Sequence, residues 1–88
     1  MAGSITLLTR SNCELCHEAL DGLQPWAKRL RLQVREVDID GDRELTRRFG
    51  LRIPVFLSER GTVLAEGRIG GRSAAISALR ARLGRAAK

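Results

Sequence analysis

The first 39 residues contain three successive patterns that together predict a strand–helix–strand unit. Residues 4–9, SITLLT, are a short apolar run rich in β-branched side chains, which is typical of a buried strand. A stripe with three- and four-residue spacing follows and predicts a helix; its members are Cys13, Cys16, Leu20, Leu23, Ala27 and Leu30. Residues 32–39 alternate imperfectly and predict a second strand at a sheet edge. Because a helix joins these strands, we expect them to be parallel, with a right-handed connection.

A short helix and a hairpin are predicted next. Asp40 or Asp42 can cap the short helix, and Gly50 can end it in the left-handed conformation. Residues 53–57 and 62–67 are short strand patterns separated by SERG, as in an antiparallel hairpin. We expect the three large aromatic side chains to pack in or near the core: Trp26, Phe49 and Phe56.

The last predicted element is a helix over residues 70–84. Ser73 is its expected N-cap. Three of its large apolar side chains are expected to face inward: Ile76, Leu79 and Leu83.

Pro25 should kink or divide the first helix, because proline has no N–H to donate. The order βαβαββα predicts an α/β fold in a single domain, residues 1–88, with a four-stranded mixed sheet flanked by three helices.

Composition narrows the range of functions. The chain is 43% hydrophobic and 30% charged, as in a soluble globular domain, and no run of about 18 apolar residues would span a membrane. The start, MAGSITLL, lacks the features of an export signal, so we expect a cytoplasmic protein without membrane contact. The net charge is +6, but the arginines are dispersed and there is no aromatic platform for bases, so nucleic-acid binding is not expected.

The stretch TRSNCELCHEAL, residues 9–20, holds both cysteines. In the cytoplasm such a pair is more often catalytic or metal-binding than structural. Cys13 opens a helix, where free N–H groups and the helix dipole stabilise a thiolate and lower the pKa of its thiol from about 8.5. Arg10 should add to this effect and Glu14 should oppose it. Cys16 heads the apolar stripe and should be more buried, so we expect Cys13 to attack a disulfide and Cys16 to resolve it.

A C-x-x-C-H motif can also attach haem or contribute to a metal site. CELCH matches a haem attachment motif, but His17 is the only histidine, Met1 the only methionine, and no export signal is visible. Structural zinc takes four ligands, and the chain offers two cysteines and one adjacent histidine. A glutathione-bridged metal or iron–sulfur site in a dimer stays open, as does a non-enzymatic adaptor or redox-sensing module.

Three motifs make the chain resemble the short bacterial glutaredoxin-like proteins of the thioredoxin-like superfamily, over Ile5 to about Leu83. They are RSNCELC at the first strand–helix junction, RIPV before the third strand, and RIGG before the last helix. The resemblance implies a thioredoxin-like fold and thiol–disulfide oxidoreductase activity. It also implies a monomer with no tightly bound cofactor and no metal, which uses glutathione as co-substrate or acts on thiol and disulfide proteins. Glutathione or a thioredoxin reductase would regenerate it.

The resemblance also implies a glutathione site. Arg10 stands where a family lysine holds one glutathione carboxylate, and Ile53, before a cis-Pro54, would pair with the bound thiol compound through its backbone. The other carboxylate would bind at the start of the last helix, at Gly70, Gly71, Arg72 and Ser73, with Arg52 adding charge nearby. Two positions depart from the family pattern: Glu14–Leu15 replaces Pro-Tyr, and Ser73–Ala74 replaces an acidic pair.

Overall fold

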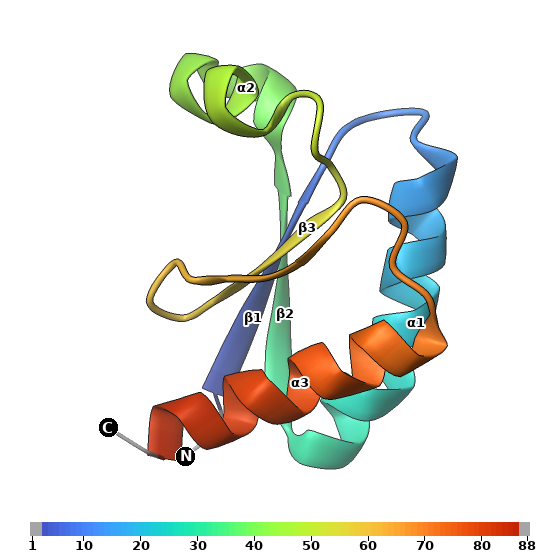
Figure 1. The fold of residues 1–88 in the computed structure, drawn as a ribbon, viewed down its shortest axis with the longest axis vertical. Helices are drawn as coiled ribbons and strands as arrows, with labels where there is room; N and C mark the ends of the chain where they lie inside the picture. The colour runs from blue at the N-terminus through green and yellow to red at the C-terminus, as the bar shows by residue number, and fades with distance from the viewer. Residues whose placement is uncertain (1–2, 87–88) are drawn as a thin grey trace.

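The computed structural model of the chain describes residues 3–86 and contains the predicted elements in the predicted order (Figure 1). They are β1 (Gly3–Thr9), α1 (Glu14–Leu30), β2 (Leu32–Asp38), a short 3-10 turn η1 (Ile39–Gly41), α2 (Arg43–Phe49), β3 (Val55–Ser58), β4 (Val63–Glu66) and α3 (Gly71–Ala86). None of the helices within residues 3–86 has the length and apolar character needed to cross a membrane.

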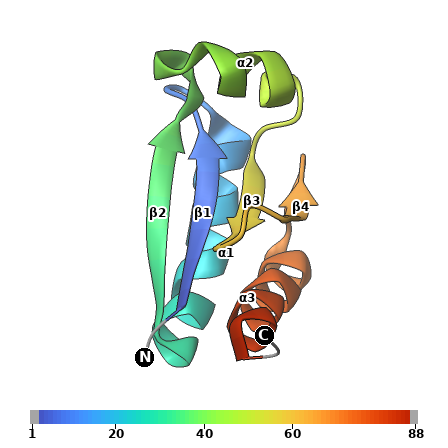
Figure 2. The same ribbon diagram turned by 90° about the vertical axis from the view of Figure 1, so that its left-hand side faces the viewer.

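The four strands form one mixed sheet in the order β2-β1-β3-β4 (Figure 2). β1 and β2 are parallel, with Leu7 opposite Glu36, whereas β3 is antiparallel to both β1 and β4. The βαβ unit, the closing hairpin and the edge position of β2 are therefore as predicted. The alternation along β1 sends Ile5 and Leu7 to one face of the sheet and Leu8 to the other, so both faces acquire an apolar cluster.

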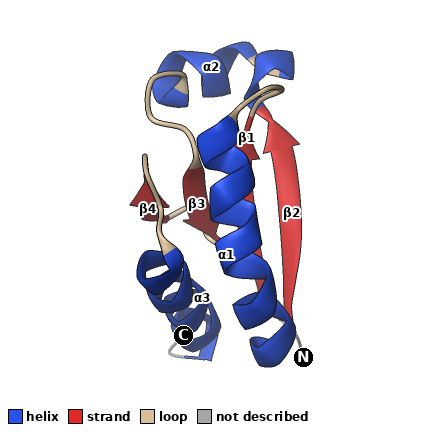
Figure 3. Cartoon of the chain, turned by 90° about the vertical axis from the view of Figure 1, so that its right-hand side faces the viewer, coloured by secondary structure: helices blue, strands red, loops and turns tan. Residues whose placement is uncertain are grey.

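Two clusters of buried side chains hold the layers together. α1 and α3 cover the same face of the sheet (Figure 3), and the larger cluster lies beneath them, around Phe56, Ile5, Leu7, Leu23 and Ala78. The smaller cluster consists of Leu8, Ile39, Phe49 and Val55, close to α2, which crosses the end of the sheet where β1 and β2 finish (Figure 2). Phe49 and Phe56 are buried and Trp26 packs on the larger cluster, as expected.

α1 is one continuous helix, so Pro25 does not divide it; of the two expected effects, division is excluded. The missing N–H would have served the carbonyl of Asp21, one turn earlier. Both Pro25 and Asp21 lie on the exposed side of the helix, where water can bind the released carbonyl. On the opposite side, Cys16, Leu23 and Ala27 keep the helix attached to the sheet.

The ends of α2 are only partly as expected. Asp42 is its N-cap, accepting a hydrogen bond from the Leu45 N–H over 3.0 Å, as predicted. Gly50 ends the helix in the right-handed conformation, with φ of −55°, so the left-handed prediction is wrong. A Cβ at Gly50 would lie 2.5 Å from the carbonyl oxygen of Thr46. Close packing, rather than a positive φ, is the reason for glycine at this position.

α3 faces the protein with small side chains, which reverses the predicted orientation. Ile76, Leu79 and Leu83 are exposed. The side chains that pack inward are Ala74, Ser77, Ala78 and Ala81. A Cβ at Gly22 of α1 would lie only 3.6 Å from the Cβ of Ala74, so the two helices approach too closely for large side chains between them. The predicted N-cap is also wrong: Ser73 is the third residue of the helix.

Candidate functional site

The turn between β1 and α1 places both cysteines at the start of the helix. Asn12 adopts the left-handed conformation, with φ of 60°, and Cys13 becomes the N-cap of α1. Asparagine is one of the few residues besides glycine that adopt this conformation readily. Cys16 lies one turn further on, and the two cysteines form a disulfide with a Cα–Cα distance of 5.2 Å. The predicted dithiol is thus assembled at a helix N-terminus.

The two sulfur atoms have different surroundings. Cys16 is 3% exposed and belongs to the buried face of α1, whereas Cys13 is partly exposed. This order of exposure is the predicted one. The Cys16 N–H donates a hydrogen bond to the Cys13 Sγ over 3.2 Å. In the reduced protein, the same N–H and the positive end of the helix dipole would stabilise negative charge on Cys13. Glu14, the next residue, is exposed.

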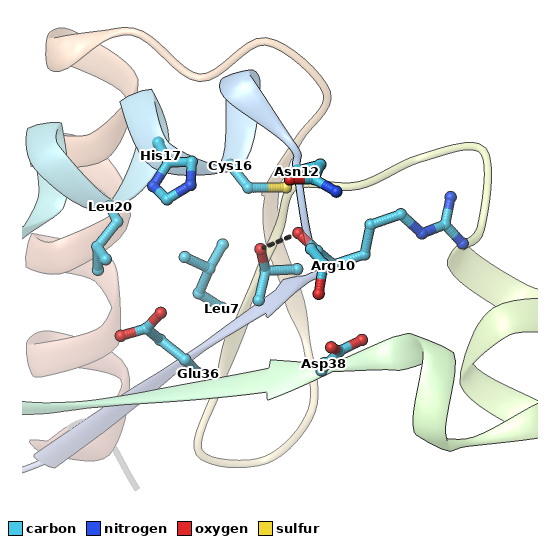
Figure 4. Close-up of a pocket in the computed structure, with 10 residues that line it drawn as sticks. Leu7, Arg10, Asn12, Cys16, His17, Leu20, Glu36 and Asp38 are labelled. Atoms are coloured by element: carbon cyan, nitrogen blue, oxygen red, sulfur yellow. Dashed lines mark hydrogen bonds between the residues drawn. The ribbon is translucent and has the colours of Figure 1, made fainter.

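A pocket of about 230 Å³ opens on the β2 side of the disulfide (Figure 4). Residues from β1, the turn, α1 and β2 line it: Leu7, Thr9, Arg10, Ser11, Asn12, Cys16, His17, Leu20, Glu36 and Asp38. It brings two acids of β2 and His17 of α1 into the same cavity as the buried Cys16. Glu36 and Asp38 were not singled out from the sequence, although their two-residue spacing on a strand places them on one face. The buried Cys16 thus borders this pocket.

Arg10 is already paired within the chain. Its guanidinium lies 3.1 Å from the Asp40 carboxylate in η1. In Figure 4 its side chain extends away from Cys16. Both partners are partly exposed, so the pair is weak and can exchange with an anion from solution. Arg10 therefore lies at the edge of the site, with its charge directed at Asp40 rather than at the sulfur atoms.

The peptide bond between Ile53 and Pro54 is cis, as the resemblance implied. Figures 1 and 3 show the loop that carries it at the end of the molecule where α1 begins. Pro54 is buried and its carbonyl accepts a hydrogen bond from the Gly67 N–H over 2.9 Å. The Ile53 N–H donates to the Phe49 carbonyl over 3.2 Å. A ligand that paired with the Ile53 N–H would therefore have to displace that bond.

Arg52 and Leu51, which precede the cis peptide bond, differ in their contacts: Arg52 is paired and Leu51 is exposed. Arg52 forms an ion pair with Glu66, and its guanidinium lies 4.9 Å from the centre of the Phe49 ring. Its charge is therefore directed toward Glu66 and not freely offered to a ligand. Leu51, beside it, is fully exposed, with a relative accessibility of 102%. Sequence periodicity gave no reason to select this leucine, because it lies in a turn.

The remaining predicted site residues lie at the start of α3. Gly71 is the first residue of the helix, and the Ala74 N–H donates to the Gly70 carbonyl over 2.9 Å. Arg72 is exposed and Ser73 is partly exposed. A Cβ at Gly22 would lie 3.8 Å from the Gly71 Cα. Gly22 is nine residues beyond Cys13, which is roughly 14 Å along a helix. This part of the site thus lies farther from Cys13 than the roughly 10–11 Å that three extended residues span.

Within residues 3–86, no three side chains among His, Cys, Asp and Glu are grouped so that they could hold a metal ion.

Comparisons with known proteins agree with this arrangement. Residues 4–83 match the glutaredoxin-like domain (DUF836). The crystal structure of XcR50 from X. campestris is 30% identical, with 92% of this chain and 96% of that chain covered and a TM-score of 0.67. No curated protein matches the chain.

Two more distant structures share the fold. A malarial protein is 18% identical, with 97% of each chain covered and a TM-score of 0.56. Thioredoxin 1 from Thermosipho africanus TCF52B is 16% identical, with 97% of this chain and 99% of that chain covered and a TM-score of 0.62. The disulfide-bonded C-x-x-C at the start of α1 is therefore set in a thioredoxin-like fold, and this chain belongs to the glutaredoxin-like domain family.

Proposed function

We propose that this protein is a thiol–disulfide oxidoreductase in which Cys13 attacks and Cys16 resolves. The observation that carries the proposal is the difference between the two sulfurs: Cys13 is accessible at the helix N-terminus, whereas Cys16 is 3% exposed. An incoming disulfide can reach only the accessible sulfur. The thiolate that reacts fastest is one that is both exposed and stabilised.

The reaction balances as two successive exchanges. The Cys13 thiolate attacks one sulfur of a substrate disulfide, and the other substrate sulfur leaves as a thiolate that takes up a proton. Cys16 then loses its proton and attacks the Cys13 sulfur, which releases the second substrate thiol. The substrate gains two electrons, and the protein is left with the Cys13–Cys16 disulfide seen here. The pocket beside Cys16 offers the leaving proton a route to solvent.

Regeneration requires an external reductant. Two molecules of glutathione, or a thioredoxin reductase, would return the disulfide to the dithiol. A reducing compartment such as the cytoplasm suits this cycle. We also propose that the protein acts as a monomer. Its partners would be glutathione or other proteins that carry thiols or disulfides.

Glutathione is the proposed small co-substrate. Its thiol would meet Cys13, its backbone would lie along Ile53 and Pro54, and one carboxylate would bind at Gly70, Gly71, Arg72 and Ser73. The supporting observation is the exposed Arg72 in the first turn of α3, where helix N–H groups also favour an anion. The second carboxylate would have to draw Arg10 from Asp40, which a weak exposed ion pair permits.

A turnover assay with two electron donors tests the proposal. We expect reduction of a glutathione mixed disulfide by the wild-type protein, loss of turnover in Cys13→Ser, and residual glutathione-dependent activity in Cys16→Ser. Parallel assays with glutathione and with thioredoxin reductase identify the reductant. An inactive wild-type protein with both donors would contradict the proposal and favour an adaptor module. Turnover in Cys13→Ser, with none in Cys16→Ser, would reverse the assigned roles.

A further inference from the structure

The outer side of α3 carries a line of large apolar side chains that are exposed among the described residues. Ile76, Leu79 and Leu83 are 52%, 48% and 56% exposed. We call these three residues the outer seam. The helix uses Ala74, Ala78 and Ala81, with Ser77, for its contacts with the rest of the domain. The large apolar side chains of α3 are therefore on the solvent side, where they contribute little to the core.

The spacing of the outer seam is that of a helix–helix contact. Its members are separated by three and then four residues, as are successive a and d positions of a heptad. At about 100° per residue they span only about 60° of the helix circumference. A strict a/d stripe is the narrow seam of a coiled coil, whereas the apolar face of an ordinary amphipathic helix covers about 100° or more. The narrow seam favours a partner helix over a lipid surface.

The charged residues that α3 itself places beside the seam are arginines. Arg80 is exposed next to Leu79, and Arg72 is exposed one turn before Ile76. α3, Gly71–Ala86, contains no acidic residue. Two copies of the seam packed together would bring arginines opposite arginines, which is unfavourable. A partner with acidic residues at the flanking positions would be attracted instead.

We propose that the outer seam of α3 is a docking surface for an amphipathic helix of another protein, with Glu or Asp beside its apolar stripe. In Figure 1, α3 runs across the lower end of the molecule, whereas α1 begins at the upper end. A helix bound to the seam would therefore leave Cys13 open. This surface would hold the domain near a partner without occupying the redox site.

Two synthetic peptides test the proposal by titration of the isotope-labelled full-length protein, observed by NMR. Both form amphipathic helices with leucine and isoleucine at the seam positions; one carries Glu at the flanking positions and the other carries Lys. We expect the acidic peptide to bind and to shift amide signals between residues 72 and 83, and the basic peptide to bind at least about tenfold more weakly.

Three variants make the test specific. We expect Leu79→Ser to weaken binding of the acidic peptide about tenfold, and Arg80→Glu to shift the preference toward the basic peptide. Leu51→Ser is the matched control, because Leu51 is an exposed leucine in the turn before β3, outside the seam. All three positions are exposed, and the NMR spectrum reports directly whether each variant is folded.

Several results would overturn the proposal. They are absence of binding by the acidic peptide, equal binding of both peptides, and equal loss of affinity in Leu51→Ser and Leu79→Ser. Self-association of the free protein that Leu79→Ser abolishes would assign the seam to a second copy. Co-sedimentation with anionic lipid vesicles that Leu79→Ser abolishes would assign it to a membrane surface.

Discussion

Glu14 should have two opposite effects, one on helix stability and one on thiol reactivity. It is the first residue of α1, directly after Cys13, and it is exposed. A carboxylate at a helix N-terminus stabilises the helix by about 0.3–1 kcal/mol. The same charge repels a thiolate on Cys13. Glu14→Gln should therefore destabilise the protein and, at the same time, make Cys13 easier to ionise.

The sizes of both effects follow from the position of Glu14 next to Cys13 at the start of α1. Charges on adjacent residues lie roughly 7 Å apart, which gives about 0.6–1.2 kcal/mol of repulsion at an effective dielectric constant of roughly 40–80. Glu14→Gln should therefore lower the pKa of the Cys13 thiol, because the carboxylate that repels the thiolate is removed. A loss of about 0.3–1 kcal/mol should lower the melting temperature of the oxidised protein by roughly 2–6 °C.

Both effects are measurable on one pair of proteins. The alkylation rate of the reduced protein as a function of pH, with mass spectrometry to locate the label, gives the midpoint for Cys13. Low ionic strength keeps the charge interaction large. Glu18→Gln, an exposed acid one turn further along α1, is the matched control and should change the midpoint less. An unchanged or raised midpoint in Glu14→Gln would refute the electrostatic argument.

Three further predictions concern stability, and urea unfolding measures each of them. Gly22→Ala should be tolerated or stabilising by up to about 1 kcal/mol, because its Cβ meets Ala74 at an ordinary 3.6 Å, whereas Gly22→Leu should cost about 1–3 kcal/mol by overpacking the helices. Asp42→Ala should cost about 1 kcal/mol, because the Leu45 N–H loses its cap; an unchanged midpoint would contradict this. Phe56→Ala, in the fully buried core, should cost about 3–5 kcal/mol, and a loss below about 1 kcal/mol would contradict the packing described here.

The secondary structure could be predicted from the sequence where a hydrophobic pattern fits only one kind of element. The run at residues 4–9 and the stripe that begins at Cys13 can bury their apolar sides together only as a strand followed by a helix. That arrangement also makes Cys16 more buried than Cys13, because Cys16 lies on the buried face of the helix. The structure has both features.

The orientation of α3 could not be predicted from hydrophobicity alone. The helix has a row of large apolar residues, beginning at Ile76, and a row of small ones, beginning at Ala74; either row could have faced the domain. The close approach of Gly22 on α1 decides in favour of the small row, and this contact spans about fifty positions in the sequence. Local patterns do not contain such contacts.

The most direct test of the proposed mechanism is to locate the mixed disulfide that each single-cysteine variant forms with oxidised glutathione, by mass spectrometry of the intact and digested protein. In Cys16→Ser, we predict a stable glutathione adduct on Cys13, because the accessible sulfur reacts and no resolving thiol remains to release it. In Cys13→Ser, the buried Cys16 should stay largely unmodified. An adduct that forms faster on Cys16 than on Cys13 would contradict the account.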